Sequence, residues 1–479
     1  MPFVPVVLWT DALIFVLVGA SIAAAVYSLR QAHLRAAWRR VGESRAGMAA
    51  LAVLTLFLAV GLLDSLHYRP RLANSGGQQQ SAFGVEVLSV FDALAAGLRT
   101  RTEKTYSAPL ATQAFAKETL ERGDGTQTRD FPRLKHGGAH LGDPGQDQLA
   151  DIAYRAFKGL ALGAVAWLAI AMVLVAVQSR RSDQPLDRTW RSIVRGETRL
   201  AWNAVLWALA AAAVLLGPLL ALSGSYHVFG TDKVGQDVLY LTLKSIRTAL
   251  VIGTLTTLVT LPFAVALGLL AGYFGGWIDD VIQYLYTTLN SIPGVLLIAA
   301  AVLMMQVVID THPEWFATAA ERADARLLAL CLILGVTSWT GLCRLLRGEA
   351  LKLRELDYVQ AAEAFGVSHG RIIARHLLPN VMHIVLIALV MDFSGLVLAE
   401  AVLSYVGIGV DPTTISFGTM INTARMELSR EPVVWWSLAA AFVFMFTLVL
   451  AANLFADAVR DAFDPRARPR PRRSLRAAT

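Results

Sequence analysis

Nine long apolar runs constrain this chain more than any other feature of its sequence. A transmembrane helix needs about 20 mostly apolar residues, and 55% of the 479 residues are hydrophobic while only 16% are charged. Inside a bilayer every backbone N–H and C=O must be paired within its own segment, so the runs are predicted to be helices. The sequence therefore predicts an all-α, polytopic membrane protein with nine spans, to within one. The runs lie at residues 4–29, 46–66, 156–178, 200–222, 249–272, 279–309, 326–345, 380–403 and 433–456.

Clusters of arginine between these runs predict the orientation of the chain. Short loops rich in Lys and Arg stay in the cytoplasm, and counting the crossings places three arginine clusters on one side of the membrane. We therefore expect the N-terminus outside and the C-terminus in the cytoplasm. The same placement accounts for the net charge of +7 without a nucleic-acid partner. The clusters consist of Arg30, Arg35, Arg39, Arg40 and Arg45; of Arg180, Arg181, Arg188, Arg191, Arg195 and Arg199; and of Arg466, Arg468, Arg470, Arg472, Arg473 and Arg476.

The runs and the polar segments between them divide the chain into five parts. The largest polar segment is expected to be external (periplasmic). Its mixed charge and Gly-rich patches leave two interpretations open, a small helical domain or a partly ordered segment. The Pro- and Arg-rich tail is expected to lie near anionic lipid headgroups. The parts are an N-terminal transmembrane pair at 1–66, the external insert at 67–155, a third span with a basic cytoplasmic linker at 156–199, a six-span domain at 200–463 with a polar loop at 347–379, and a cytoplasmic tail at 464–479.

Neither the histidines nor the cysteines form a pattern that predicts a metal site. His136 and His140 stand four residues apart, but the two glycines between them disfavour the helix that such a pair of ligands requires. Cys331 and Cys343 lie in one apolar run and have the number and spacing of neither a disulfide framework nor a metal site. Both cysteines are interpreted as small packing residues.

A polar stretch at residues 357–380, DYVQAAEAFGVSHGRIIARHLLPN, separates two apolar runs and predicts two short cytoplasmic helices. Asp357 and Gln360 have the spacing of a capping-box pair, and Gly366 supplies the left-handed residue that ends the first helix. Periodicity alone supports two interpretations equally, a docking element for a partner protein and a linker along the lipid headgroups. The predicted apolar face of the first helix consists of Tyr358, Ala361, Ala362 and Phe365.

This stretch resembles the EAA loop of permease subunits from binding-protein-dependent ABC importers. In that loop Glu-Ala-Ala is followed by Gly and, further on, by Leu-Pro-Asn. The corresponding residues here are QAA at 360–362, Gly366 and LPN at 378–380, so Gln replaces Glu.

A second motif resembles one subgroup of these permeases more specifically. GTDKVGQDV at 230–238 is similar to the Gly-Thr-Asp-x-x-Gly-Arg-Asp-Val signature of dipeptide, oligopeptide and nickel permeases, with Gln236 in place of Arg. Similar stretches follow in the same order, including GLLAGYFGGWIDD, LAEAVLSYVGIGV and RDAFDPR, so the resemblance covers about 229–466. The GTD start and the closing DPR are typical of the second, C-type permease of a pair. The signature residues Gly230, Asp232, Gly235 and Asp237 are interpreted as structural, with contact to a binding protein as the alternative.

The resemblance implies the six-span core of a type I ABC importer permease in the bacterial inner (plasma) membrane, preceded by an extension of about three spans. It implies three kinds of partner: a second permease subunit in a heterodimer, two ABC ATPase subunits and a periplasmic substrate-binding protein. The chain lacks the motif G-x-x-x-x-G-K-[ST], so ATP and Mg are expected only in the partner subunits and no residue here is expected to be catalytic. The residues expected to couple to the ATPase are Asp357, Tyr358, Ala361, Ala362, Phe365 and Gly366.

The resemblance also defines the expected substrates. Import of di- or oligopeptides is the first reading, and import of nickel or another small solute is the alternative. A secondary transporter would show inverted repeats, and no convincing internal repeat occurs in the sequence. A membrane enzyme would need a cluster of reactive side chains at one depth in the membrane. A sensor function would rest on the external insert alone.

Four residues within apolar runs are candidates for the translocation path. A carboxylate at the bilayer centre costs about 2.5–3.5 kcal/mol, so Asp392 and Glu400 are expected either to line a path or to accept hydrogen bonds from a neighbouring helix. Asn290 and Pro293 lie in the longest run and predict either a helix break at the path or a packing kink. Arg247 is expected to reach the outer interface with its long side chain.

Overall fold

The computed structural model describes residues 3–71, 84, 86–121 and 127–463, so the basic tail lies outside the described residues. Within them, nine helices are long and apolar enough to cross a membrane, which confirms the predicted number of spans. They are α1 (Trp9–Arg30), α3 (Arg45–Asp64), α6 (Pro144–Ser182), α8 (Trp202–Ser223), α9 (Val238–Phe274), α11 (Gly294–Thr311), the continuous pair α12 (Ala319–Ser338) and α13 (Thr340–Arg354), α15 (His369–Ile372) running through the π-helical turn η2 (Ile373–Leu377) into α16 (Leu378–Val406), and α18 (Trp436–Phe463).

The run at 279–309 differs from a single kinked span. It forms α10 (Gly276–Ser291) and the separate helix α11, and Ile292 and Pro293 lie between them. Proline lacks the N–H that would continue the hydrogen bonding of α10, so the helix ends there. Only α11 is a candidate span.

The remaining short helices connect the spans. They are α2 (Ala32–Glu43), α4 (Val90–Leu94), α5 (Ala96–Thr100), α7 (Leu186–Arg195), η1 (Pro313–Trp315), α14 (Asp357–Ala364) and α17 (Phe417–Glu427).

The insert contains strands as well as short helices, so the helical-domain reading of it was wrong. Strands β1 (Phe3–Val6), β2 (His67–Pro70) and β3 (Leu88–Ser89) form an antiparallel sheet in that order, and Phe3 pairs with Pro70. Strands β4 (Glu118–Glu121) and β5 (Gln127–Asp130) form a separate hairpin. Strand β1 therefore connects the N-terminal residues to the insert by strand pairing. Apolar periodicity carries no information on such a pairing.

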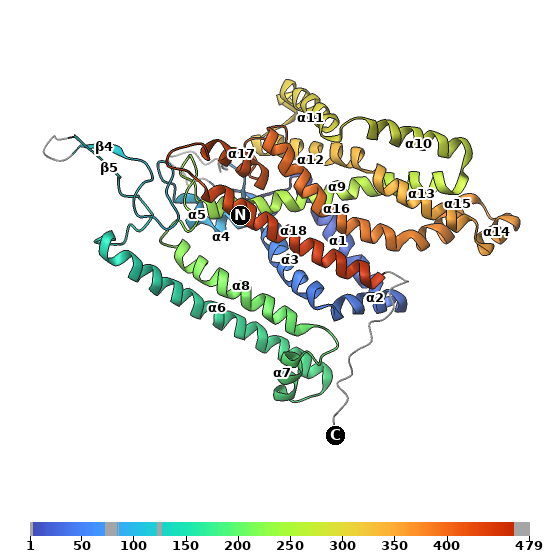
Figure 1. Ribbon diagram of the computed structural model, residues 1–479, viewed down its shortest axis with the longest axis horizontal. Helices are drawn as coiled ribbons and strands as arrows, with labels where there is room; N and C mark the ends of the chain where they lie inside the picture. Colours follow the sequence, from blue (N-terminus) through green and yellow to red (C-terminus); the bar gives the residue numbers. More distant parts are fainter. Residues whose placement is uncertain (1–2, 72–83, 85, 122–126, 464–479) are drawn as a thin grey trace.

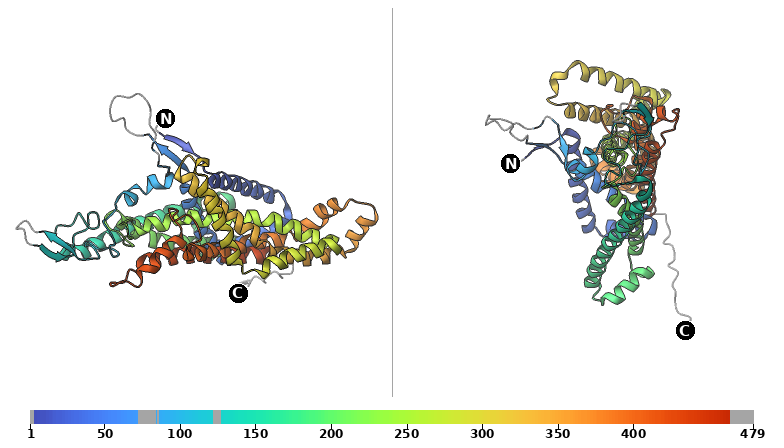
Figure 2. Two further views of the ribbon diagram at one scale, coloured as in Figure 1. Left: turned by 90° about the horizontal axis from the view of Figure 1, so that it is seen from above. Right: turned by 90° about the vertical axis from the view of Figure 1, so that its left-hand side faces the viewer.

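Helix α9 is the central element of the fold. It packs against α3, α12, α13, α16 and α10, and Figure 1 shows it running along the long axis of the molecule. We call the end that carries β4 and β5 the insert end, and the end that carries α14 and α15 the hairpin end. Figure 2 shows that the molecule is elongated between these two ends.

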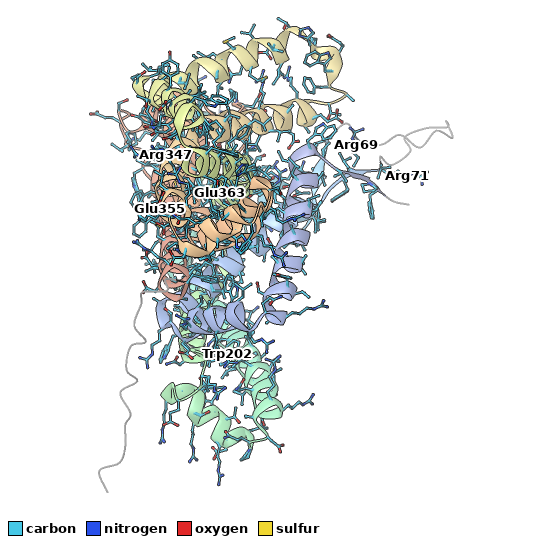
Figure 3. All side chains as sticks on the ribbon, turned by 90° about the vertical axis from the view of Figure 1, so that its right-hand side faces the viewer. Arg69, Arg71, Trp202, Arg347, Glu355 and Glu363 are labelled. Atoms are coloured by element: carbon cyan, nitrogen blue, oxygen red, sulfur yellow. The ribbon has the colours of Figure 1, made fainter. Side chains whose placement is uncertain are left out.

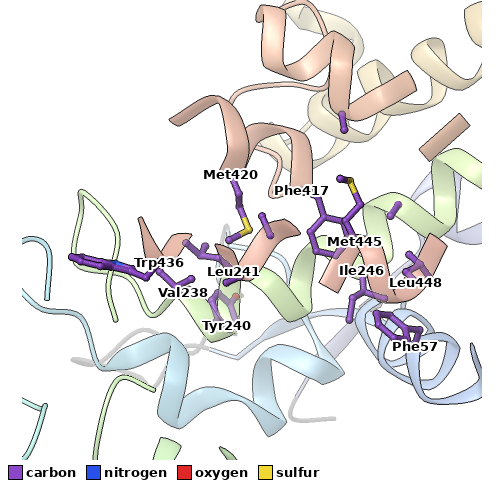
Figure 4. Close-up of a cluster of buried hydrophobic side chains, with 14 of the residues drawn as sticks. Phe57, Val238, Tyr240, Leu241, Ile246, Phe417, Met420, Trp436, Met445 and Leu448 are labelled. Atoms are coloured by element: carbon purple, nitrogen blue, oxygen red, sulfur yellow. The ribbon is translucent and has the colours of Figure 1, made fainter. Parts of the chain in front are cut away.

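Two apolar clusters support the opposite ends of α9. At the insert end, Tyr240 and Ile246 of α9 pack with Phe417 and Trp436, as Figure 4 shows. At the hairpin end, buried residues of α9, α13, α14 and α16 form one continuous cluster. That cluster includes Tyr273, Leu346, Val359, Ile372, Leu377 and Val381.

Helices α6 and α8 form a peripheral pair beside this core (Figure 1). Glycines allow their backbones to approach closely, as small residues do in membrane helix pairs. A Cβ atom on Gly159 would lie 2.4 Å from the carbonyl oxygen of Gly217, and one on Gly163 would lie 2.6 Å from that of Ala213. Because both distances are shorter than any real Cβ contact, this packing requires glycine.

Candidate functional site

The hairpin that was singled out from the sequence consists of α14 and the first turns of the long helix that begins with α15 and continues into α16. Only its first helix is separate and short, so the prediction of a second short helix was wrong. Gly366 lies between α14 and α15 with φ of +74°, in the left-handed region that the sequence predicted. The backbone N–H of Val367 donates to the carbonyl of Ala362 at 3.1 Å, which closes the end of α14. The predicted capping role of Asp357 was wrong, because the N-cap residue is Leu356 and no side chain caps the helix. Asp357 lies instead in the first turn, where its charge favours the helix dipole.

The two faces of α14 have different surroundings. Val359, which was absent from the predicted apolar face, is fully buried in the cluster at the hairpin end, and Ala362 packs against that cluster. Phe365 is 88% exposed and Tyr358 is 45% exposed. One residue thus anchors the helix, and large apolar side chains remain on its free surface.

Polar contacts hold α14 and the elements next to it in place. The side-chain amide of Asn380, from the LPN sequence, donates to the hydroxyl of Tyr358 at 3.0 Å. On α13, the guanidinium of Arg347 donates to both carboxylate oxygens of Asp279 on α10 at 2.5 and 2.6 Å. A bidentate pair of this kind fixes orientation as well as distance.

A polar cleft of about 450 Å³ lies between α14, α15 and the end of α9. Figure 3 views the molecule from the hairpin end and labels Glu355 and Glu363, two of the residues that line this cleft. The hydroxyl of Tyr273 lies 2.9 Å from Nδ1 of His369 across the cleft. Its lining residues are Tyr273, Phe274, Arg354, Glu355, Gln360, Glu363 and His369.

The four candidates for the translocation path lie in different settings. Asn290 is exposed on α10 and its side-chain oxygen accepts a hydrogen bond from Thr340 at 3.1 Å, while Pro293 is exposed at the helix break. Asp392 is half-buried on α16 and has no hydrogen-bond or ion-pair partner within the part of the chain that the structure describes.

Glu400, on the same helix, lies in a hydrogen-bonded site of its own. It is buried, and its Oε1 accepts hydrogen bonds from the hydroxyls of Ser404 at 2.6 Å and Ser416 at 2.9 Å. Its contacts therefore match the second of the two expectations, a carboxylate that is satisfied by neighbouring serines.

The signature loop at 230–238 forms the entry to α9. Asp237 accepts a hydrogen bond from the N–H of Leu239 at 2.9 Å and is the N-cap of α9, as the structural interpretation predicted. Asp232 accepts hydrogen bonds from the backbone N–H of Val234 and Gln236 within the turn. Gly230 and Gly235, the other signature residues, have φ of +70° and +76°.

His227 and Glu103, which the sequence did not indicate, join this loop to the insert. Nδ1 of His227 lies 2.7 Å from Oδ2 of Asp237, and Nε2 lies 3.3 Å from Oε1 of Glu103. Glu103 also accepts hydrogen bonds from three backbone N–H groups, at residues 135 to 137. We call these residues the His227 cluster. The one sequence signal for this cluster was a histidine ten residues before Asp237. Glu103 lies 124 residues before His227 in the sequence, so no local pattern could connect the two.

The charges in the His227 cluster stabilise one another. Burial alone would lower the pKa of His227, but hydrogen bonds to Asp237 and Glu103 raise it to about 9. Burial alone would raise the pKa of Glu103, but hydrogen bonds from His227 and the three backbone N–H groups lower it to about 2. An imidazolium between two carboxylates therefore connects the insert to the start of α9 at neutral pH.

Two further clusters bind the N-terminal helices to α9. Lys244 donates to Asp92 of α4 at 2.6 Å and to Asp64 of α3 at 3.1 Å. Arg247 donates to Asp11 of α1 at 2.6 Å and is only 11% exposed, so it lies in a buried ion pair, and its position at the outer interface stays a prediction. Removing either partner of a buried ion pair would leave the other charge buried and unpaired, which is strongly destabilising.

Comparisons with known proteins decide the family. The family described as "Binding-protein-dependent transport system inner membrane component" matches residues 264–469. The oligopeptide transport system permease protein OppC of Mycobacterium tuberculosis is 32% identical over 291 residues, which cover 94% of that protein and 58% of this chain. The chain belongs to this family of importer permeases. The resemblance inferred from the EAA-like and GTD stretches is thereby confirmed, including the C-type subunit.

Other relatives of this permease carry related names. The dipeptide transport system permease protein DppC of Lactococcus lactis is 31% identical over 241 residues, covering 64% of that protein and 50% of this chain. The glutathione transport system permease protein GsiD of Pectobacterium atrosepticum is 31% identical over 244 residues, covering 73% of that protein and 50% of this chain. This permease is thus a multi-pass inner membrane component of a binding-protein-dependent transport system, and not an enzyme.

Proposed function

We propose that this permease is the C-type membrane subunit of an ABC importer for di- or oligopeptides. Relatives named for oligopeptide, dipeptide and glutathione transport support a peptide substrate and do not favour nickel. The observation that carries the proposal is the hairpin, a rigidly anchored pair of helices with exposed apolar side chains. These features support a docking element over a linker.

We propose that an ATPase subunit docks on the hairpin. Large apolar side chains that remain exposed mark protein or membrane interaction sites, and an aromatic residue on a well-supported helix has the character of a binding hot spot. Because Val359 joins α14 to the cluster shared by α9, α13 and α16, motion of the ATPase would be passed directly to three spans. The coupling residues remain Asp357, Tyr358, Ala361, Ala362, Phe365 and Gly366.

ATP and Mg are proposed to bind in the partner subunits, since this sequence has no phosphate-binding loop motif. A second permease and a periplasmic binding protein would complete the complex. The arginines around α2 and α7 support a cytoplasmic position for these elements and for the hairpin, with the N-terminus outside.

Asp392 is our proposal for a carboxylate that lines the path, because it is half-buried on α16 without a partner among the described residues. It would favour the amino group of a peptide. Asn290 and Pro293 are kept as path candidates at the break between α10 and α11. The hydrogen bonds of Glu400 to two serines favour a structural role for that residue.

Uptake by the reconstituted complex tests the proposed function. Vesicles that contain this permease and its co-purified subunits should accumulate di- or oligopeptides on addition of ATP and the binding protein. Ala361→Arg should abolish uptake while leaving this chain in the membrane, because the residue is exposed on α14. Normal peptide uptake by that variant would refute the coupling assignment, and ATP-dependent uptake of nickel without peptide would refute the substrate.

A further inference from the structure

An apolar groove of about 500 Å³ lies along the peripheral helix α6, outside the coupling site. The residues of α6 that line it recur at spacings of three and four, so they form one continuous stripe on the helix. The lining consists of Ala169, Ile170, Val173, Leu174, Val177, Gln178 and Arg181 of α6 together with Trp202 at the start of α8.

The length of the groove matches one leaflet of a membrane. From Ala169 to Arg181 the helix rises by twelve residues, which at roughly 1.5 Å per residue gives about 18 Å. Half of the hydrocarbon core of a bilayer is about 15 Å thick. A single extended acyl chain therefore fits along the stripe from the bilayer centre to the helix end.

Positive charge marks the polar end of the groove. Arg181 lies in its lining, and no residue in the described part of the chain forms an ion pair or hydrogen bond with this guanidinium. Arg180 precedes it on α6, and Arg188 and Arg195 lie on α7. Trp202 lies at the same end, and tryptophan is enriched at the level of lipid headgroups.

Helix α7 places these charges at the membrane surface. Its residue Ile193 is fully buried against α6 and α8, while Leu186, Trp190 and Val194 are exposed. A short helix with apolar side chains on one face and several arginines on the other is typical of a segment that lies in the interface. Figure 1 shows α7 against the ends of α6 and α8.

We propose that this groove binds one anionic phospholipid, with an acyl chain along α6 and the phosphate at Arg181. Charge complementarity selects the occupant, because basic pockets between membrane helices bind anionic headgroups. A zwitterionic lipid would fill the same apolar stripe but would not be selected by the arginine. The proposal concerns the α6–α8 pair and is independent of the transported substrate.

Photolabelling tests this site in the intact transporter complex. The complex is placed in phosphatidylcholine vesicles that contain a trace of phospholipid with a photoreactive acyl chain and either a phosphatidylglycerol or a phosphatidylcholine headgroup. After irradiation, label on the peptide containing residues 169–178 is measured by mass spectrometry. We expect the phosphatidylglycerol probe to label this peptide about fivefold more than the phosphatidylcholine probe, the ratio that one favourable arginine contact supplies.

Two variants and a control separate the site from general lipid contact. Arg181→Gln should reduce the phosphatidylglycerol label to the phosphatidylcholine level, whereas Arg180→Gln, outside the groove lining, should leave it unchanged. Val173→Trp should fill the groove and reduce the label with every charge retained. Equal labelling by both probes, equal effects of the two arginine variants, or crosslinks to another subunit or a second copy in place of lipid would each overturn the proposal.

Discussion

At the scale of single residues, charge at the insert end is placed to hold separate segments of the chain together. His227, Lys244 and Arg247 each join a different segment to α9 or to its entry loop: the insert, the α3–α4 region and α1. Breaking such a pair leaves the surviving charge buried, which costs about 3–5 kcal/mol. These residues therefore determine how firmly the N-terminal part is attached.

The His227 cluster predicts a specific pH dependence. A histidine whose pKa is raised by folding, here from 6.5 to about 9, contributes stability below pH 6.5 and loses it as the pH rises through 9. Glu103, with a pKa lowered from 4.5 to about 2, contributes above pH 4.5 and loses its contribution as the pH falls through 2. Protection of the insert should thus be greatest between pH 4.5 and 6.5.

Hydrogen exchange of the backbone amides at 103–107 in the purified complex measures this protection. Between pH 7 and 9.5 the free energy of opening should fall by about 2 kcal/mol, after correction for intrinsic exchange rates. His227→Gln should remove the pH dependence over that range, and His312→Gln, at the residue before η1, should keep it. An opening free energy that stays constant from pH 7 to 9.5 in the unaltered chain would contradict the assignment.

At the scale of elements, the hairpin depends on one left-handed residue. Gly366→Ala meets no neighbour within 4 Å, so its whole effect is the strain of an L-residue at φ of +74°. That strain costs about 1–2 kcal/mol. We expect faster hydrogen exchange in α14 and weaker recovery of the ATPase. Gly370→Ala, which also meets nothing and has no positive φ, is the matched control and should behave like the unaltered permease.

The α6–α8 pair makes a second prediction at this scale. Gly159→Leu would force a side chain into the backbone of Gly217 and should destabilise the pair by about 1–3 kcal/mol, the usual cost of overpacking. The melting temperature of the complex in detergent should fall. Gly19→Leu on α1 meets open space and should leave that temperature unchanged. Equal melting temperatures for all three proteins would show that the helices do not depend on close approach.

Hydropathy predicted the spans, but the sequence did not predict which segments contact one another. Among the described residues, the nine apolar runs give nine candidate spans, because lipid leaves the backbone no other structure. Periodicity found an apolar stripe on α14, yet it missed Val359 because it carries no information on which neighbour the helix meets. The β1–β2 pairing and the partners of Arg247 join residues that lie far apart in the sequence, and such contacts leave no local pattern.

At the scale of the whole molecule, the permease is built around α9. The clusters at the insert end hold its first turns, and the hairpin end joins it to α13, α14 and α16. The proposed stroke of the ATPase on α14 would therefore reach the insert end through one continuous helix of 37 residues, about 55 Å long. This view requires that an ATPase contact the hairpin directly.

A photocrosslinking residue at position 365 tests that requirement most directly. Incorporated in place of Phe365 in living cells, it should form an adduct with a nucleotide-binding subunit, because this side chain is the most exposed apolar group on the hairpin. The same probe in place of Tyr154, which is exposed on α6, should give no such adduct. Adducts at position 365 with phospholipid alone would contradict the account.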